Sequence, residues 1–464
     1  MMLIKKLFTL FSVGLLSLPA SAVTLSDLYF LAIKHDPTFN AAVKEQVAGK
    51  EYENIGLSQL LPNISVNYKN NPRNWQRKAY PINIFQDKIT TVEYQNYQSY
   101  SVNAIISQPL FDYTAFSEYK ASIIKTLLAD SHYQNKFSEL IIRLIDNYIQ
   151  VAYTQDKLLL NHIQVAYTQD KLLLNQAQQE IYQKQLASSQ RLFELGEGTK
   201  TDIAEIETRL YLTQSQYTDL QLEIEKAKNK LSAMIGSQLP THEHIAKLTD
   251  TKFVLQSLAP DDYSTWEKNA IQNNLKIQSA RHEMAIAKQE IEKNRGEFFP
   301  TVQFYAAYSS SNSDSNNTIN QKYQSANVGF YVSMPLFNGG KTTASMRQST
   351  AKYQMSAFER DAIIQNIMQE LRYQYQICST SHIKLMAFEQ AVSSAKLQLN
   401  ATRKSYVGGQ RTMVDVLNAE ELLYRAQQDL IKAKYDYIQA WALLHQYTNT
   451  LDIEKIKIIE NYFQ

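Results

Sequence analysis

The chain has 464 residues with 47 basic and 45 acidic side chains, 12 glycines and one cysteine. The balanced charge gives no support to nucleic-acid binding, and the lone Cys378 excludes an internal disulfide or a cysteine metal site. Glycine is scarce against a usual share of about 7 per cent. This scarcity favours long helices, because a glycine inside a helix costs about 1 kcal/mol relative to alanine.

Residues 1–22 have the composition of a secretory signal peptide. Two lysines precede an apolar run over residues 7–18, and Ala20-Ser-Ala22 matches the small-residue cleavage pattern. We expect cleavage after Ala22, which leaves equal numbers of basic and acidic residues. A short membrane anchor is the alternative, but an apolar run of about 12 residues is too short to span a bilayer.

The remainder of the sequence is predicted to form two structural repeats. Similar landmarks recur in the same order: Leu61-Pro-Asn-Ile64 and Phe299-Pro-Thr-Val302, Pro109-Leu-Phe111 and Pro335-Leu-Phe337, Thr201-Asp-Ile203 and Val414-Asp-Val416. Internal similarity of this kind predicts two copies of one supersecondary unit. The repeats would span residues 23–240 and 261–450, with a linker at 241–260 and a C-terminal tail at 451–464.

Each repeat contains two segments in which apolar and polar residues alternate. They lie at 64–69 and 101–107 in the first repeat, and at 302–308 and 327–334 in the second. Strict alternation predicts strands with one apolar and one polar face. A membrane barrel strand needs this pattern, with lipid outside and water inside. A half-buried soluble sheet shows it too.

The rest of each repeat is predicted to be helical, with apolar residues spaced by three and four. One stripe follows Ile206, Leu210, Thr213, Tyr217, Leu220, Ile224, Ala227 and Leu231, and its match follows Ala419, Leu423, Ala426, Leu430, Ala433, Tyr437, Ala440 and Leu444. This spacing predicts left-handed coiled-coil seams. Longer helices are expected from Asp112 to about Phe193 and from Asn338 to about Tyr406. The second would be roughly 100 Å long, which suits a structure crossing the periplasm.

Residues 149–161 recur without change at 163–175. The offset between the two copies is two heptads, so the seam would stay in phase while the helix lengthens by about 21 Å. The sequence leaves open whether these turns extend the helix or loop out.

Four strands per chain predict an oligomer if the sheet lies in lipid. The strands are expected to be about 8–12 residues long, with outward-facing loops at 70–100 and 309–326. Four such strands cannot close a barrel, and lipid tolerates no open sheet edge. Two chains would give eight strands, whose interior is filled by side chains. Three chains would give twelve strands with room for water, so a conduit favours a trimer.

The same order of strands and helices occurs twice after the signal peptide. This arrangement resembles that of the TolC family of outer-membrane efflux and secretion proteins. The most specific stretches are Tyr406–Asn418 and Leu195–Asp202, and the opening Leu25–Pro37 also looks like the start of family members. The resemblance covers essentially the whole mature chain.

The resemblance implies a mainly α protein with membrane β-structure. A homotrimer would form a twelve-stranded β-barrel, four strands per chain, continuing into a long periplasmic α-helical coiled-coil barrel. The implied function is an exit duct in the outer membrane for small molecules or unfolded proteins. Implied partners are outer-membrane lipid, a periplasmic adaptor (membrane fusion) protein and an inner-membrane transporter of the ABC or RND type. No enzymatic activity, catalytic residue, cofactor or metal is expected.

The resemblance also implies a gate at the periplasmic tip, held by bonds between two helical hairpins. The matching residues are Thr201, Asp202, Tyr406 and Arg411. Arg411 can donate several charge-assisted hydrogen bonds and Tyr406 one, with Asp202 accepting.

Related channels carry acidic rings at the entrance. Asp415 matches one ring, Asn418 stands where the family often has a second Asp, and Glu205 in the first repeat is positioned to restore the charge. If it does, the entrance would still favour cations. For each of these charged residues, the alternative interpretation is a solvated helix end without a role in the channel. The hairpin tips, where an adaptor would dock, fall at Gly196, Glu197, Gly409 and Gln410.

The sequence disfavours two other protein classes. An enzyme is disfavoured because Thr241-His-Glu-His244 has no further ligand pattern around it. A soluble periplasmic adaptor with a coiled-coil hairpin explains the heptads, but it explains neither the alternating strands nor the repeat.

Overall fold

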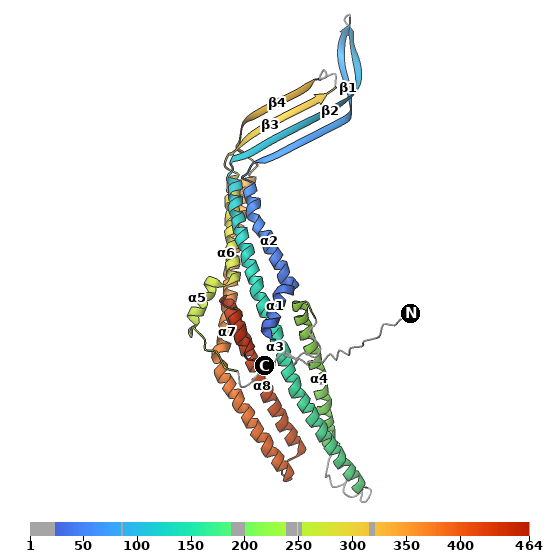
Figure 1. Cartoon of the computed structure of the whole chain (residues 1–464), viewed down its shortest axis with the longest axis vertical. Coiled ribbons are helices and arrows are strands. Elements are labelled where there is room, and N and C mark those ends of the chain that lie inside the picture. The colour runs from blue at the N-terminus through green and yellow to red at the C-terminus, as the bar shows by residue number, and fades with distance from the viewer. Residues whose placement is uncertain are drawn as a thin grey trace, which may run out of the picture. The chain divides into compact units, whose positions relative to one another are not determined.

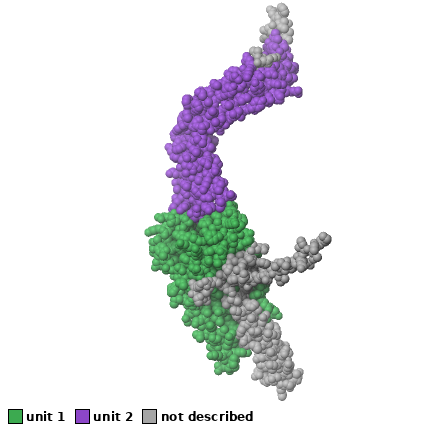
Figure 2. Space-filling view, in the orientation of Figure 1, with its two compact units in different colours: residues 1–41, 136–274, 367–464 green, residues 42–135, 275–366 purple. Residues whose placement is uncertain are grey.

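The computed structural model describes residues 24–84, 87–186, 200–237, 248, 253–314 and 321–463; side chains at 83–84, 87–89, 158–186, 200–207, 209 and 413 are outside the description. The elements in chain order are α1 (Leu25–His35), α2 (Pro37–Ser58), β1 (Asn63–Ile84), β2 (Asp87–Phe111), α3 (Tyr113–Leu186), α4 (Lys200–Ile235), α5 (Tyr263–Asn273), α6 (Leu275–Gly296), β3 (Thr301–Ser313), β4 (Lys322–Ser333), α7 (Lys341–Val407), α8 (Met413–Tyr447) and α9 (Ile453–Glu460) (Figure 1). They divide into two compact units (Figure 2).

Unit 2 comprises Ala42–Asn135 and Leu275–Asn366 and contains the sheet. In the described part of the chain, four strands pair antiparallel in the order β1-β2-β3-β4. Paired residues share a face of a sheet, and the apolar positions fall opposite one another. Val66 lies opposite Ala104, Ala104 opposite Tyr308, and Tyr308 opposite Ala326. One face of the sheet is therefore apolar across all four strands, as the alternation predicted.

This apolar face is exposed in the single chain. Val66 is 67% exposed, and Val328 and Phe330 on β4 are 71% and 69% exposed. The other face is mainly polar, and Ser309 Oγ donates to Asn103 Oδ1 there at 2.7 Å. A water-soluble sheet would cover its apolar face with helices, so this face requires an apolar environment from outside the chain.

The predicted loop at 70–100 is wrong. β1 and β2 run for 22 and 25 residues, far beyond the 13 residues of β3 and 12 of β4. β2 pairs with β3 only from Ser99 to Phe111, whereas its pairing with β1 continues to Asp87. The ladder shifts between Asn71 and Asn74, where Pro72 has no backbone N–H for a regular ladder. Alternation fades beyond this bulge because both faces of a two-stranded ribbon meet solvent.

The loop expected at 309–326 is also too long. β3 continues to Ser313 and β4 begins at Lys322. Serines dominate the added part of β3, and their small polar side chains give no period of two for sequence reading to detect.

Close helix packing holds the base of the sheet within unit 2. A Cβ added to Gly49 of α2 would lie 2.2 Å from the Cβ of Ala129 on α3, and one on Gly296 of α6 would lie 2.5 Å from Thr114 Oγ1. Glu118 of α3 meets Lys125 at 2.9 Å and Lys293 of α6 at 2.8 Å. These hydrogen-bonded lysines outweigh partial burial and lower the pKa of Glu118. Glycine at positions 49 and 296 thus lets α2 and α6 approach α3 more closely than any side chain would permit.

Unit 1 contains the coiled-coil helices, and their burial confirms the heptad stripes. The described members of the first stripe are buried or half-buried on α4, with Leu231 at 0% exposure. None of the second stripe is exposed on α8, and Leu444 is also at 0%. Small alanines at seam positions allow the helices to approach closely.

Both ends of the described chain pack into unit 1. Asp36, between α1 and α2, is 2% exposed and accepts hydrogen bonds from Arg143 and from the backbone N–H of Phe39. Residues 451–464, predicted as a tail, contain α9, whose Ile456 and Ile459 are fully buried. Glu460 Oε2 accepts a hydrogen bond from the backbone N–H of Ser26 at 3.0 Å. This N–H lies in the first turn of α1, where it has no partner within the helix.

The duplicated segment lies inside α3, whose backbone is helical without a break from Tyr113 to Leu186. The second copy therefore extends the helix and does not loop out. The helix expected from Asn338 begins at Lys341, because Gly339 and Gly340 have φ of 67° and 83° and such values interrupt a right-handed helix. None of the helices in the described ranges combines the length and apolar character needed to cross a membrane.

Candidate gate and hairpin tip

The turn between α7 and α8 is a compact helix-capping structure. The N–H of Gln410 donates to the carbonyl of Ser405 at 2.9 Å, and that of Gly409 donates to the carbonyl of Tyr406 at 3.0 Å. This pair of bonds is a Schellman motif. Gly409 has φ of 71°, a conformation that glycine adopts without steric cost. The predicted tip residues Gly409 and Gln410 thus form a defined turn with capping as their visible role.

Thr412 and Asp415 form a capping box at the start of α8. Asp415 N–H donates to Thr412 Oγ1 at 3.2 Å, while Thr412 N–H and Oγ1 donate to Asp415 Oδ2 at 2.9 and 3.0 Å. The backbone hydrogen bond, then the hydroxyl and Arg411, hold the pKa of Asp415 below its ordinary value. The carboxylate assigned to the entrance ring is therefore ionised and fixed in orientation. The spacing Thr412-x-x-Asp415 is typical of a capping box, which the sequence analysis did not predict.

The two predicted gate residues on this hairpin differ in burial. Tyr406 packs against a buried cluster of Leu399, Val416, Leu417 and Ala419. Arg411 is exposed, with Nη1 3.7 Å from Asp415 Oδ1, a surface ion pair of little energetic weight. The Arg411 guanidinium therefore lies near the tip, and none of the ion pairs among the described residues of this hairpin joins it to a buried carboxylate.

The first-repeat members of the predicted sites are only partly within the description. Thr201, Asp202 and Glu205 lie on the backbone of α4, but their side chains are outside it. Gly196 and Glu197 lie outside the described residues, as does Thr241-His-Glu-His244. Asn418 is exposed on α8, one turn beyond Asp415. The pairing across the gate stays a prediction.

An ion pair missed by the sequence reading joins the two helices of this hairpin. Arg403 Nη2 of α7 lies 2.6 Å from Glu420 Oε1 of α8. The side chain of Glu420 is only 12% exposed, so solvent screens the pair less than an open surface pair. The contact closes the hairpin within about two helical turns of its tip, and heptad spacing alone does not indicate it.

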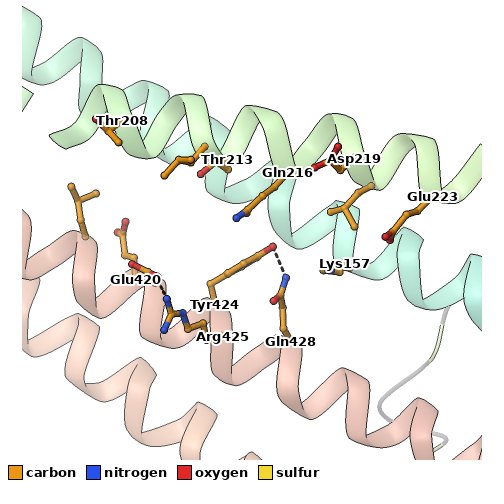
Figure 3. A pocket seen from close by; sticks show the side chains of 14 residues that line it. Lys157, Thr208, Thr213, Gln216, Asp219, Glu223, Glu420, Tyr424, Arg425 and Gln428 are labelled. Atoms are coloured by element: carbon orange, nitrogen blue, oxygen red, sulfur yellow. Dashed lines mark hydrogen bonds and ion pairs between the residues drawn. The ribbon is translucent and has the colours of Figure 1, made fainter. Parts of the chain in front are cut away.

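A groove of about 740 Å³ separates α4 from α8, with Lys157 of α3 also lining it. Gln216 of α4 and Tyr424 of α8 point into the space between the helices (Figure 3). The acidic lining residues are Asp219, Glu223, Glu420 and Glu421, against the basic Lys157 and Arg425. Burial is the main cause that raises the pKa of Tyr424 to about 12, so its hydroxyl stays protonated at neutral pH. The hydroxyl oxygen accepts a hydrogen bond from Gln428 Nε2 at 2.6 Å. The groove between α4 and α8 is therefore polar and carries more acidic than basic side chains.

Within the described ranges, no three His, Cys, Asp or Glu side chains are grouped to hold a metal ion. The buried Cys378 has a pKa raised to about 12 by desolvation, so its thiol is a weak nucleophile at neutral pH.

The chain thus combines a sheet that has one exposed apolar face with long paired helices that have a capped tip. The sequence model of the outer membrane efflux protein family matches residues 28–237 and 266–450. The chain belongs to this family. The predicted family, outer-membrane location and role in an export channel are thereby confirmed, and the family is one of channels, not of enzymes.

Named relatives cover nearly the whole chain. It is 36% identical over 444 residues to the alkaline protease secretion protein AprF of Pseudomonas aeruginosa, covering 96% of this chain and 88% of that protein. It is 32% identical over 451 residues to the proteases secretion protein PrtF of Dickeya chrysanthemi, covering 96% and 92%. The outer membrane protein TolC of Vibrio cholerae is 26% identical over 461 residues, covering 97% of each.

Solved structures share the fold. VceC, an outer membrane protein from Vibrio cholerae, superposes with a TM-score of 0.70 at 16% identity, covering 91% of this chain and 96% of that one. The CmeC outer membrane channel of Campylobacter jejuni superposes with a TM-score of 0.73 at 15% identity, covering 95% and 90%. The mainly helical fold with a four-stranded antiparallel sheet is therefore shared with these outer membrane channels.

Proposed function

We propose that three copies of this chain form one outer-membrane duct, with twelve strands in the barrel and paired helices lining a periplasmic tunnel. The observation that carries the proposal is the register-aligned apolar face of the sheet, exposed in the single chain. In lipid, the free edges of β1 and β4 would leave backbone groups without partners. Pairing β1 of one copy with β4 of the next satisfies them, and twelve strands leave a water-filled interior.

The domain boundaries follow from the same proposal. Residues 1–22 direct export and are removed, and residues 23–240 and 261–450 each supply two strands and one helical hairpin. Residues 241–260 join the repeats, and residues 451–464 pack beside the N-terminal helix. The burial of α9 supports this last assignment.

The gate is proposed to lie at the tips of the two hairpins. Arg411 and Tyr406 on one hairpin would bond Thr201 and Asp202 on the other, and opening would separate them. Two observations support this: Arg411 is exposed at the tip, and Asp415, whose Oδ1 lies 3.7 Å from Arg411 Nη1, is already engaged by its own helix. The three copies of Asp415, with Glu205 near Asn418, would favour cations at the entrance. Gly196, Glu197, Gly409 and Gln410 would meet the adaptor.

The proposed cargo is unfolded protein, including proteases, passed from an ABC-type transporter. The relatives named for protease secretion are 36% and 32% identical over nearly the whole chain. The solvent efflux pump protein SrpC of Pseudomonas putida is 23% identical over 54% of it. Deleting the gene and measuring secreted protease and drug susceptibility together tests the choice. Unchanged secretion with increased drug sensitivity would select small-molecule efflux.

Matched substitutions on the two faces of β1 test the duct itself. Val66→Arg places a charge on the apolar face, where it costs about 2–4 kcal/mol at the bilayer midplane; Asn67→Arg places the same charge on the polar face. We expect trimers by light scattering and channels in planar bilayers for the parent and Asn67→Arg, but few for Val66→Arg. Equal assembly of both variants would contradict the membrane placement, and a monodisperse monomer without detergent would contradict the duct.

A further inference from the structure

The long ribbon formed by residues 74–84 of β1 and 87–98 of β2 is not used by the barrel. It extends past the ends of β3 and β4, by on the order of 35 Å at about 3.3 Å per residue. Figure 1 shows it leaving the end of the four-stranded sheet. A two-stranded ribbon without a covering layer is only marginally stable in water, so its length calls for a partner.

One face of the ribbon continues the apolar face of the sheet. Counting by twos along β2 from Val102, an apolar-face residue, reaches Tyr94, and Tyr94 lies opposite Arg77. Trp75 is two residues from Arg77 and shares its face. The rings of Trp75 and Tyr94 are 6.1 Å apart, and both side chains are 65% exposed. The face therefore presents two adjacent aromatic rings and a guanidinium.

The chemistry of this face changes with distance from the sheet. Its apolar band ends near Tyr68 and Tyr308. Tyr100 follows this band on β2 and lies opposite Asn312 of β3. Lys322 of β4 pairs with Asn312, so it lies at the same level as Tyr100, and its side chain is exposed. Next come the aromatic pair and Arg77. The apolar band is therefore followed by a zone that mixes aromatic and cationic side chains, as is typical of a protein surface at the lipid–water interface.

The charge on the ribbon is mostly positive. Among its described side chains and the bulge before it, the charged residues are Arg73, Arg77, Lys78 and Glu93. Lys78 lies on the opposite face, directly across from Glu93, with Nζ 5.0 Å from the ring centroid of Tyr80. Arg77 is exposed on the face that continues the apolar face of the sheet, which we call the outward face. A planar guanidinium there can bind a phosphate through two hydrogen bonds.

We propose that the outward face of the ribbon, centred on Trp75, Arg77 and Tyr94, binds the phosphorylated headgroup of a glycolipid in the outer leaflet. Arg77 contacts a phosphate, and the two rings lie against the sugar. The proposal rests on the membrane placement of the sheet under Proposed function. It adds a lipid-recognition site that the duct itself does not require.

Adjacent residues on opposite faces of the ribbon supply the test. Detergent-solubilised full-length protein, with Arg77→Gln or Lys78→Gln as matched charge removals, is titrated with fluorescent lipopolysaccharide. We expect Arg77→Gln and the double variant Trp75→Ser/Tyr94→Ser to weaken binding by roughly five- to tenfold, and Lys78→Gln to leave it within about twofold. Dephosphorylated lipopolysaccharide should bind the parent as weakly as intact lipopolysaccharide binds Arg77→Gln.

Three results would overturn the site. Equal binding by all variants, equal loss in Arg77→Gln and Lys78→Gln, or full competition by inorganic phosphate at the same concentration as the lipid would each contradict it. Conductance in bilayers of phospholipid alone, recorded for the same preparations, separates this outcome from failure of the duct. Channels with no Arg77-dependent binding refute the lipid site only, whereas the absence of channels in the parent refutes the duct.

Discussion

Arg143 binds both carboxylate oxygens of Asp36, with Nη2 3.1 Å from Oδ1 and Nη1 3.3 Å from Oδ2. Asp36 is 2% exposed and sits where α1 ends and α2 begins. The pair therefore fixes the N-terminal helices against α3, 107 residues later in the chain.

Removing Arg143 should destabilise unit 1. Arg143→Ala leaves a buried carboxylate with only the N–H of Phe39, which costs about 1–3 kcal/mol. The arginine is 39% exposed, so solvent moderates the loss. Thermal unfolding of purified protein followed by circular dichroism measures it. Arg425→Ala, which breaks the exposed pair with Glu421 on the same helix, should change stability by less than about 0.5 kcal/mol and serves as the control.

Weakening the proposed gate should raise conductance. Arg411→Ser removes the donor that would bond Asp202 and Thr201 on the other hairpin, so single-channel conductance in planar bilayers should increase. Lys404→Ser removes one positive charge from the last turn of α7, close to the same tip, and should leave conductance unchanged. An unaltered conductance in Arg411→Ser would count against the gate, and an equal rise in both variants would indicate a general charge effect.

The capping box should tune the pH dependence of cation preference. Because the folded pKa of Asp415 is depressed, its charge and its capping contribution are present above the ordinary carboxyl pKa of about 3.9 and disappear as pH falls through the lower folded value. Thr412→Val removes the hydroxyl that donates to Asp415, so the cation preference should fade at a higher pH than in the parent.

Reversal potentials in a salt gradient, recorded from pH 3 to 7, measure this shift. Asp415→Asn should show a weaker cation preference than the parent at pH 7. Identical titrations for the parent and Thr412→Val would contradict the role of the capping box.

His445 should make unit 1 less stable in acid. Its ring lies 4.4 Å from Trp441 and 5.4 Å from Trp266, and burial, then Lys455, lowers its pKa to about 4. The unfolded chain binds a proton below about pH 6.5 that the folded chain excludes until about pH 4. Stability is therefore complete above about 6.5 and falls with decreasing pH in that window, by up to about 1.4 kcal/mol per pH unit.

Unfolding midpoints between pH 4 and 7 check this expectation. His445→Gln should flatten the slope in this window, whereas His382→Gln on α7 should retain the slope of the parent. A parallel pH dependence in the parent and His445→Gln would exclude His445 as its source.

Local periodicity determined much of the fold. Alternation at 64–69 and 327–334 and the heptads of α4 and α8 each repeat over a few residues, and burying one face of a strand or helix imposes such a pattern. The apolar face and the buried seams were therefore predicted correctly. The bounds of α7 followed from its composition to within three residues at its start, where Gly339 and Gly340 adopt positive φ.

Only the tertiary structure decided the contacts between distant segments. The length of the β1–β2 ribbon depends on strand pairing without a buried face, so no period marks it in the sequence. The Asp36–Arg143 and Arg403–Glu420 pairs and the groove between α4 and α8 depend on which helix surfaces meet. Charged residues follow no single periodicity, and their partners are chosen by packing across the fold.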